Sequence, residues 1–270
     1  MRLSLSEIST VNASFAEDVA AYAAAGFSAI GIWELKLPAD DDANRALLRS
    51  QRLAVSNCVP AVPSILQLGI PGMEGPADPA ERIEALCASV RRLAAYEPEC
   101  VLVLSGPLGG RAAADAREIV SAGLGRVAAA AREAGVRLGF EPTHPAELET
   151  TSFVTSVADA VALLDDAGLD DVGIMADTYN LWDDEGAAEW LARNPGRVTG
   201  LHVAGPPGSG AGRALPGQAG ERERELVDAL RAAGWSGSLD VEIFSTPDGF
   251  WSLPVEEAAR RAFDAAQALL

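Results

Sequence analysis

The 270-residue sequence has little positive charge and few cysteines. It holds 21 lysines and arginines against 39 aspartates and glutamates, a net charge of −18, and Lys36 is its single lysine. A nucleic-acid partner is excluded, because binding phosphate backbones needs a basic surface. The three cysteines, Cys58, Cys87 and Cys100, are odd in number and lie in apolar runs. This usage is typical of reduced core cysteines in a cytoplasmic protein.

Targeting, membrane and dinucleotide-binding signals are also missing. Met1-Arg2 leads directly into a predicted strand, so no signal peptide is expected. No apolar run reaches the roughly 20 residues that cross a membrane, so no membrane partner is expected. No Gly-x-Gly-x-x-Gly follows the first predicted strand, which argues against an open dinucleotide-binding sheet. An apolar content of 49% indicates an ordinary globular core.

What the sequence does contain is an alternation of apolar strands and helical stretches. Strands are predicted over 2–9, 27–33, 53–59, 100–104, 136–140, 172–176, 198–201 and 238–241. Helices are predicted over 15–25, 41–51, 79–97, 112–134, 153–167, 185–192, 221–233 and 255–270. Eight such pairs without an internal linker predict one (β/α)₈ TIM barrel domain over residues 1–270, with an open doubly wound sheet as the alternative. In a barrel, all strands end at the same mouth, where the chemistry takes place.

Two connections lack a helix or strand pattern. Residues 60–79 hold five prolines and several apolar side chains, among them Leu68, Ile70 and Met73. So long an irregular connection is uncommon and is often functional. We expect either a lid over an active site or a contact with another subunit, so a homo-oligomer is left open. The second connection is a Gly/Pro-rich loop over 205–220.

Four predicted strands each lead directly into a side chain that can bind a metal. These residues are Glu141, Asp177, His202 and Glu242. Each has an ordinary explanation when taken alone, as a charge on the rim or as a hydrogen-bonded core histidine. Four of them at the ends of consecutive strands favour a metal site. Three carboxylates and one imidazole suit one divalent ion, Mn²⁺ foremost, with Co²⁺, Mg²⁺ or Zn²⁺ as alternatives.

These segments resemble motifs of the xylose isomerase-like TIM barrel superfamily, often labelled sugar phosphate isomerases/epimerases. The similar stretches are Glu141-Pro142-Thr143-His144-Pro145, Asp177-Thr178-Tyr179-Asn180, Leu201-His202-Val203, Arg213 with Leu215-Pro216-Gly217-Gln218, and Asp240-Val241-Glu242-Ile243-Phe244. The resemblance implies that Glu141, Asp177, His202 and Glu242 hold one divalent metal. It also implies that Arg213 contacts substrate oxygens, and that Glu141 and Glu242 act as the acid and base. Many epimerases of the superfamily have histidine where this chain has Asn180.

Three further residues near the predicted rim have two interpretations each, and a fourth has one. Glu34 ends the second predicted strand and matches a substrate-contacting position of the superfamily, or else forms a salt bridge. His144 is a candidate proton carrier or an exposed loop histidine. Trp182 is a candidate wall over a sugar ring or a core residue, and Asn180 is a candidate substrate contact.

The leading functional hypothesis is a metal-dependent isomerase or epimerase of a ketose, keto-cyclitol or related sugar. It would act through a metal-stabilised enediolate, with paired glutamates moving the proton. The first alternative is a lyase or dehydratase of the same fold, including one that cleaves a sugar from an aglycone. The second is a non-catalytic sugar-binding protein. The endonuclease branch of the superfamily is rejected, because it needs several metal-binding histidines and this chain has two.

Overall fold

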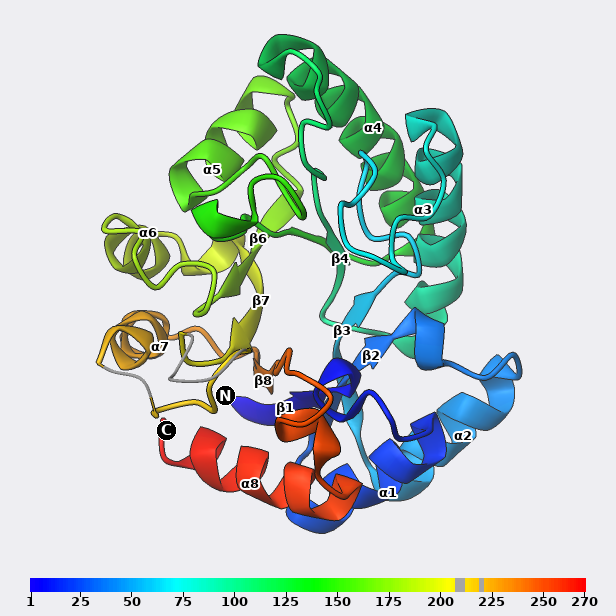
Figure 1. The fold of residues 1–270 in the computed structure, drawn as a ribbon, viewed down its shortest axis with the longest axis vertical. Helices are drawn as coiled ribbons and strands as arrows, with labels where there is room; N and C mark the ends of the chain where they lie inside the picture. Colours follow the sequence, from blue (N-terminus) through cyan, green and yellow to red (C-terminus); the bar gives the residue numbers. More distant parts are fainter. Residues whose placement is uncertain (207–211, 219–220) are drawn as a thin grey trace.

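The computed structural model describes residues 1–206, 212–218 and 221–270. Within them, eight parallel strands close into a barrel in the order of the chain, and helices surround it (Figure 1). The strands are β1 (Arg2–Ser6), β2 (Ala29–Trp33), β3 (Ala54–Val59), β4 (Cys100–Val103), β5 (Leu138–Phe140), β6 (Val172–Asp177), β7 (Val198–Val203) and β8 (Ser238–Val241). The α-helices are α1 (Phe15–Ala25), α2 (Asp41–Gln51), α3 (Pro79–Leu93), α4 (Ala113–Ala134), α5 (Val157–Asp166), α6 (Ala187–Arg193), α7 (Arg222–Ala232) and α8 (Val255–Gln267). This closed barrel confirms the predicted (β/α)₈ fold.

The barrel closes where β8 pairs with β1, with Leu239 opposite Leu3. Apolar side chains of the strands and helices form the main core between the barrel and its outer ring. Cys58, Cys87 and Cys100 are buried and free, as the sequence predicts. None of the described helices is long and apolar enough to cross a membrane.

Several predicted element boundaries were wrong, and local hydrogen bonds explain two of the errors. The fifth helix begins at Val157 rather than at Phe153, because the Ser156 side chain caps it by accepting a hydrogen bond from the Asp159 N–H. The first strand ends at Ser6, and a 3₁₀ turn, η1 (Glu7–Thr10), follows it. In that turn Ser9 donates to the Val241 carbonyl and accepts from the Ile243 N–H, so its hydroxyl bonds to the end of β8 instead of continuing the strand.

The segment 60–79 contains no helix or strand before Pro79, where α3 begins, but backbone hydrogen bonds attach it to the barrel mouth. The Ile65 and Leu66 N–H groups donate to the carbonyls of Leu104 and Ser105, beyond the end of β4. Further along, the Gly69 N–H donates to the Thr150 carbonyl at 2.7 Å. The segment, which follows β3 in the chain, is therefore bonded both to the residues after β4 and to the loop that follows Glu141. The loop predicted over 205–220 lies partly outside the described residues.

Arg82 of α3 holds the segment from inside. Its side chain is fully buried and donates to the Ser64 carbonyl at 2.9 Å, the Ser64 hydroxyl at 2.6 Å and the Pro76 carbonyl at 2.9 Å. Burial lowers the pKa of its guanidinium to about 10. The charge is thus balanced by carbonyl dipoles at both ends of the segment.

We expect Arg82→Met to lower the free energy of unfolding by about 3 kcal/mol, because it leaves several buried acceptors without a donor. Hydrogen exchange in residues 60–79 should speed up more than exchange in the strands. Arg91→Met is the matched control, since the Arg91 side chain on the same helix is 56% exposed. Equal exchange in both variants would show that Arg82 does not hold the segment.

Candidate metal centre

The structure brings the four predicted ligands together at the barrel mouth. Glu141 follows β5, Asp177 ends β6, His202 lies in β7 and Glu242 follows β8. All four are buried, and one ligand atom from each lies within 4.8 Å of the others. Their convergence follows from the sheet register, which places Asp177 opposite His202. We call these four residues the ligand quartet.

The His202 ring lies beside two carboxylates of the quartet, and neither of its nitrogens makes a hydrogen bond to any described residue. Its Nδ1 lies 3.6 Å from Glu141 Oε1 and 3.4 Å from Glu242 Oε2, yet both ring nitrogens are buried and unsatisfied. Burial by itself lowers the pKa of His202, but the nearby carboxylates outweigh burial and raise it to about 10. Buried polar atoms without partners are rare in proteins. A divalent ion between the imidazole and the carboxylates would satisfy this arrangement, and hard oxygens with one nitrogen are a suitable donor set.

Arg213 adds a fixed positive charge beside the quartet. Its Nη1 lies 2.8 Å from both Asp177 Oδ2 and Glu242 Oε2. Its guanidinium carbon also lies 4.4 Å from the centre of the Tyr179 ring. Burial lowers the pKa of Arg213, but Asp177 and Glu242 outweigh it and hold this pKa above its ordinary value. The arginine is therefore a permanent cation that partly neutralises the three carboxylates.

Asn180 connects two members of the quartet. Its Nδ2 donates to Glu141 Oε1 and to Asp177 Oδ2, both at 3.1 Å, while its Oδ1 accepts from the His144 N–H at 3.2 Å. The sequence-based hypothesis made this residue a substrate contact only. The structure shows that its amide fixes the orientation of the two carboxylates, while the substrate contact stays a prediction.

Asp240 is a residue that the sequence analysis missed. It is buried and lies opposite His202 in the sheet register, with its Oδ2 3.5 Å from His202 Nε2 and 2.7 Å from the donating Nδ2 of Asn57. A Cβ at Gly31 would collide with the Asp240 carboxylate, so the glycine leaves room for it. The signal was present in the sequence, because Asp240 and Glu242 are two residues apart and so share one face of the strand.

We expect Asp240→Asn to weaken Mn²⁺ binding by about 10–100-fold. In the neutral ring, a carboxylate at Nε2 keeps the proton on that nitrogen and leaves the Nδ1 lone pair directed at the glutamates. Competition with a chromophoric chelator measures the affinity. Unchanged affinity in a folded variant would mean that Asp240 does not orient His202.

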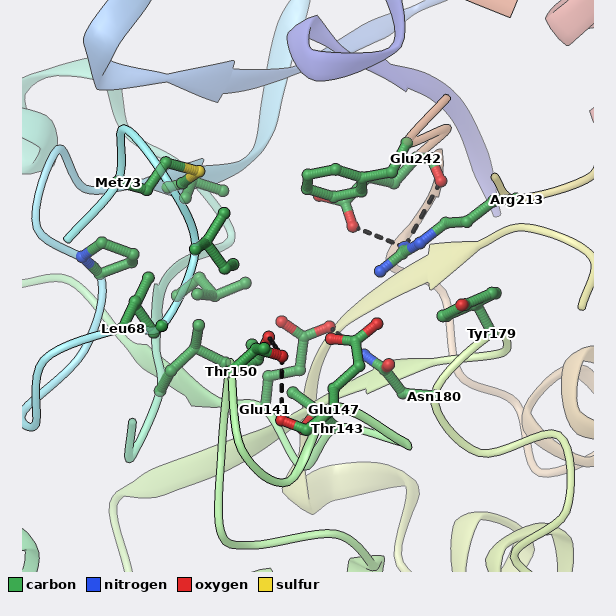
Figure 2. Close-up of a pocket in the computed structure, with 18 of the residues that line it drawn as sticks. Leu68, Met73, Glu141, Thr143, Glu147, Thr150, Tyr179, Asn180, Arg213 and Glu242 are labelled. Carbon is green, nitrogen blue, oxygen red and sulfur yellow. Dashed lines mark hydrogen bonds and ion pairs between the residues drawn. The ribbon is translucent and has the colours of Figure 1, made fainter. Parts of the chain in front are cut away.

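A cavity of about 410 Å³ opens above the quartet (Figure 2). Its polar side includes Glu141, Thr143, Tyr179, Asn180, Arg213 and Glu242. Its other side is apolar and comes from the ends of β2, β3 and β4 and from the segment 60–79. The cavity is thus lined by both glutamates of the quartet and by two of the predicted substrate contacts, Asn180 and Arg213.

Glu34, His144 and Trp182 do not line this cavity. Glu34 accepts from the Ala61 N–H at 2.9 Å and forms an ion pair with Arg92, which is the salt-bridge alternative. The His144 ring stacks on Trp182, and its Nε2 lies 3.1 Å from Asp183 Oδ2. A catalytic role for His144 and substrate contacts by Glu34 and Trp182 stay predictions, with no cavity contact in this structure to support them.

The fold and the site together define a (β/α)₈ barrel with a candidate metal centre at its mouth. Residues 19–269 match the family model described as "Xylose isomerase-like TIM barrel". The chain belongs to this family. The search of curated proteins found no matching sequence.

Solved structures show the same fold over the full length. A protein of Sinorhizobium meliloti 1021, SMc04130, has a TM-score of 0.84 at 23% identity, covering 99% of this chain and 98% of its own. The IolI protein, solved with a binding zinc atom, has a TM-score of 0.80 at 17% identity, covering 100% and 98%. The 3-keto-D-glucoside 4-epimerase YcjR of E. coli has a TM-score of 0.77 at 17% identity, also covering 100% and 98%. At these identities the likeness establishes the fold alone.

Proposed function

We propose that the protein is a divalent-metal-dependent isomerase or epimerase of a ketose, keto-cyclitol or related sugar. The observation that carries this proposal is the buried quartet, in which the unsatisfied His202 Nδ1 faces Glu141 and Glu242. Solved structures of the same fold include epimerases named for D-allulose and for a 3-keto-D-glucoside, and one with zinc. Mn²⁺ is the proposed ion, with Co²⁺, Mg²⁺ and Zn²⁺ as alternatives.

Glu141 and Glu242 are the proposed proton carriers. They follow β5 and β8, which are not neighbours in the barrel, so their carboxylates would approach a bound sugar from different directions. Epimerisation needs a base on one face of a carbon and an acid on the other. When bound, the divalent ion would polarise the carbonyl and hold the adjacent hydroxyl, which makes the neighbouring C–H more acidic.

Other residues of the cavity would position the sugar and hold the two glutamates. Arg213 can donate to substrate oxygens from Nη2, since Nη1 contacts Asp177 and Glu242, and its contact with the Tyr179 ring fixes its plane. Asn180 holds Glu141 through its amide. The Glu141 carboxylate thus keeps one orientation while the proton is transferred.

Exchange of substrate protons with solvent deuterium tests the proposal. Protein loaded with Mn²⁺ is incubated in D₂O with a panel of ketoses and keto-cyclitols, and proton NMR follows the loss of the signal α to the carbonyl. We expect exchange that depends on added Mn²⁺ and a second stereoisomer that accumulates. A filled metal site without exchange on any compound would favour the non-catalytic sugar-binding alternative.

A lyase is the second candidate, and the apolar side of the cavity favours it. Leu68, Ile70 and Met73 suit a sugar that carries an aglycone better than a free sugar. Loss of water or of an aglycone creates a new ultraviolet chromophore, whereas epimerisation creates none. Absorbance during the same incubations therefore separates the two reactions.

A further inference from the structure

The cavity has two chemically different sides, and the chemistry of a free sugar accounts for only one of them. Figure 2 shows Leu68 and Met73 across the cavity from Arg213, Tyr179 and Asn180. A free sugar carries hydroxyl groups around its whole ring. On the apolar side these hydroxyls would lose water without gaining hydrogen-bond partners.

The apolar side is a packed wall. Trp33, Val59, Leu68, Leu102 and Leu104 are each no more than 7% exposed and belong to one hydrophobic cluster inside the barrel mouth. Such a wall keeps its shape when a ligand arrives, because the side chains behind it are also buried.

The segment 60–79 extends this wall over the cavity. Ile70 and Met73 pack against the cluster while staying partly exposed. The cavity of about 410 Å³ falls in the range of roughly 300–1,000 Å³ that is usual for pockets holding drug-sized ligands. It therefore has room for a group beyond the reacting sugar.

The charges of the lining argue against an anionic ligand. Among the described residues that line the cavity, Arg213 is the only cation, and Asp177 and Glu242 already pair with it. Glu141, Glu147 and Glu242 contribute carboxylates to the same lining. A phosphate or carboxylate on the substrate would meet these acids without an unpaired cationic side chain among the described lining residues to bind it.

We infer that the substrate is an uncharged keto sugar or keto-cyclitol that carries an apolar substituent such as an aryl group. The polar part lies at the quartet, and the substituent lies on the wall of Leu68, Ile70 and Met73. The polar part of this assignment rests on the proposed function. The apolar subsite does not, because it follows from the lining alone.

The apolar subsite is tested first, without any sugar, through the uncharged fluorophore N-phenyl-1-naphthylamine. We expect saturable binding to the full chain, seen as enhanced fluorescence. The double variant Ile70→Ser/Met73→Ser should bind it at least about tenfold more weakly, because lost methylene contacts in a pocket cost roughly this much. Leu35→Ser is the matched control, since Leu35 is 60% exposed and lies outside the lining.

The substrate class is tested by displacement of this fluorophore with three glucosides that share the same sugar. We expect phenyl β-D-glucopyranoside to displace it at about tenfold lower concentration than methyl β-D-glucopyranoside. The 4-carboxyphenyl glucoside should be weaker than the phenyl compound, since it brings a charge to an acidic cavity. Preference for the methyl or the carboxyphenyl compound, or failure of the phenyl compound to displace, would overturn the inference.

Two further results would also overturn it. One is fluorophore binding that is equally strong in the double variant. The other is absence of binding to the wild type, which together with a dimer in sedimentation would mean that a second copy covers the segment 60–79.

The proposed function can stand or fall separately from this inference. Deuterium exchange on free ketoses despite such results would leave the proposed function intact. Fluorophore binding without any exchange would instead support the subsite and remove the proposed function.

Discussion

Replacing Glu242 by glutamine is expected to lower turnover by about 10²–10⁴-fold while Mn²⁺ stays bound. A carboxylate can accept a proton and an amide of the same shape cannot, whereas the amide oxygen still serves as a ligand. Solvent-deuterium exchange at the substrate α-carbon should disappear together with turnover. Glu141→Gln should also lower turnover, because the carboxylates of Glu141 and Glu242 both face His202 Nδ1.

The measurement compares kcat and bound Mn²⁺ for the wild type, Glu141→Gln and Glu242→Gln. Glu149→Gln is the control, since Glu149 is exposed and lies outside the cavity lining. If either variant keeps full activity with a filled site, that glutamate does not carry the proton. His144 would then be the next candidate base, although it would have to leave Asp183 and Trp182 to reach the cavity.

Removal of His202 has the second large expected effect. We expect the wild type to bind about one Mn²⁺ per chain and His202→Ala to bind almost none, since the imidazole is the sole nitrogen donor of the quartet. An ion that binds only the folded chain stabilises it by about 2.7 kcal/mol at a concentration of 100 times its Kd. The rise in Tm on adding Mn²⁺ should therefore vanish in the variant. His202→Gln, which keeps more of the buried volume, covers the case in which the alanine variant does not fold.

The chain provides its own control for this experiment, because His144 is the other of its two histidines. It lies outside the cavity lining, so His144→Ala should bind Mn²⁺ as the wild type does. The activity of the same variant also tests the predicted catalytic role of His144. Equal metal loading of the His202 and His144 variants would disprove the proposed metal site.

The quartet was visible in the sequence because strand ends are set by local patterns. An apolar run followed by a polar side chain and a turn marks where a buried strand stops. In a parallel barrel all these stops face one mouth, so Glu141, Asp177, His202 and Glu242 were expected to lie on one rim. Their mutual distances bear out that geometric expectation. The predicted helix boundaries were less accurate. The start of α5, for example, is set by the capping side chain of Ser156.

The roles of the surrounding residues could not be obtained in this way. Three residues lie near the predicted strand ends but do not line the cavity. The Glu34 side chain pairs with Arg92. The His144 ring contacts Asp183 and stacks on Trp182. Which way a rim side chain points depends on partners that are distant in the chain. For Glu34 that partner is 58 residues away.

The sequence by itself determined the barrel and the four strand ends that meet at its mouth, because both follow from the order of apolar runs along the chain. Only the tertiary structure decided what lies around them. Asp240 lies beside His202 because β7 and β8 pair in a register that sets the two residues opposite each other. Arg213 pairs with Asp177 and Glu242 across 36 and 29 residues of chain. The apolar wall extends over the cavity because the segment 60–79 returns to the mouth, held by Arg82. Such contacts depend on long-range packing, which no local pattern of residues encodes.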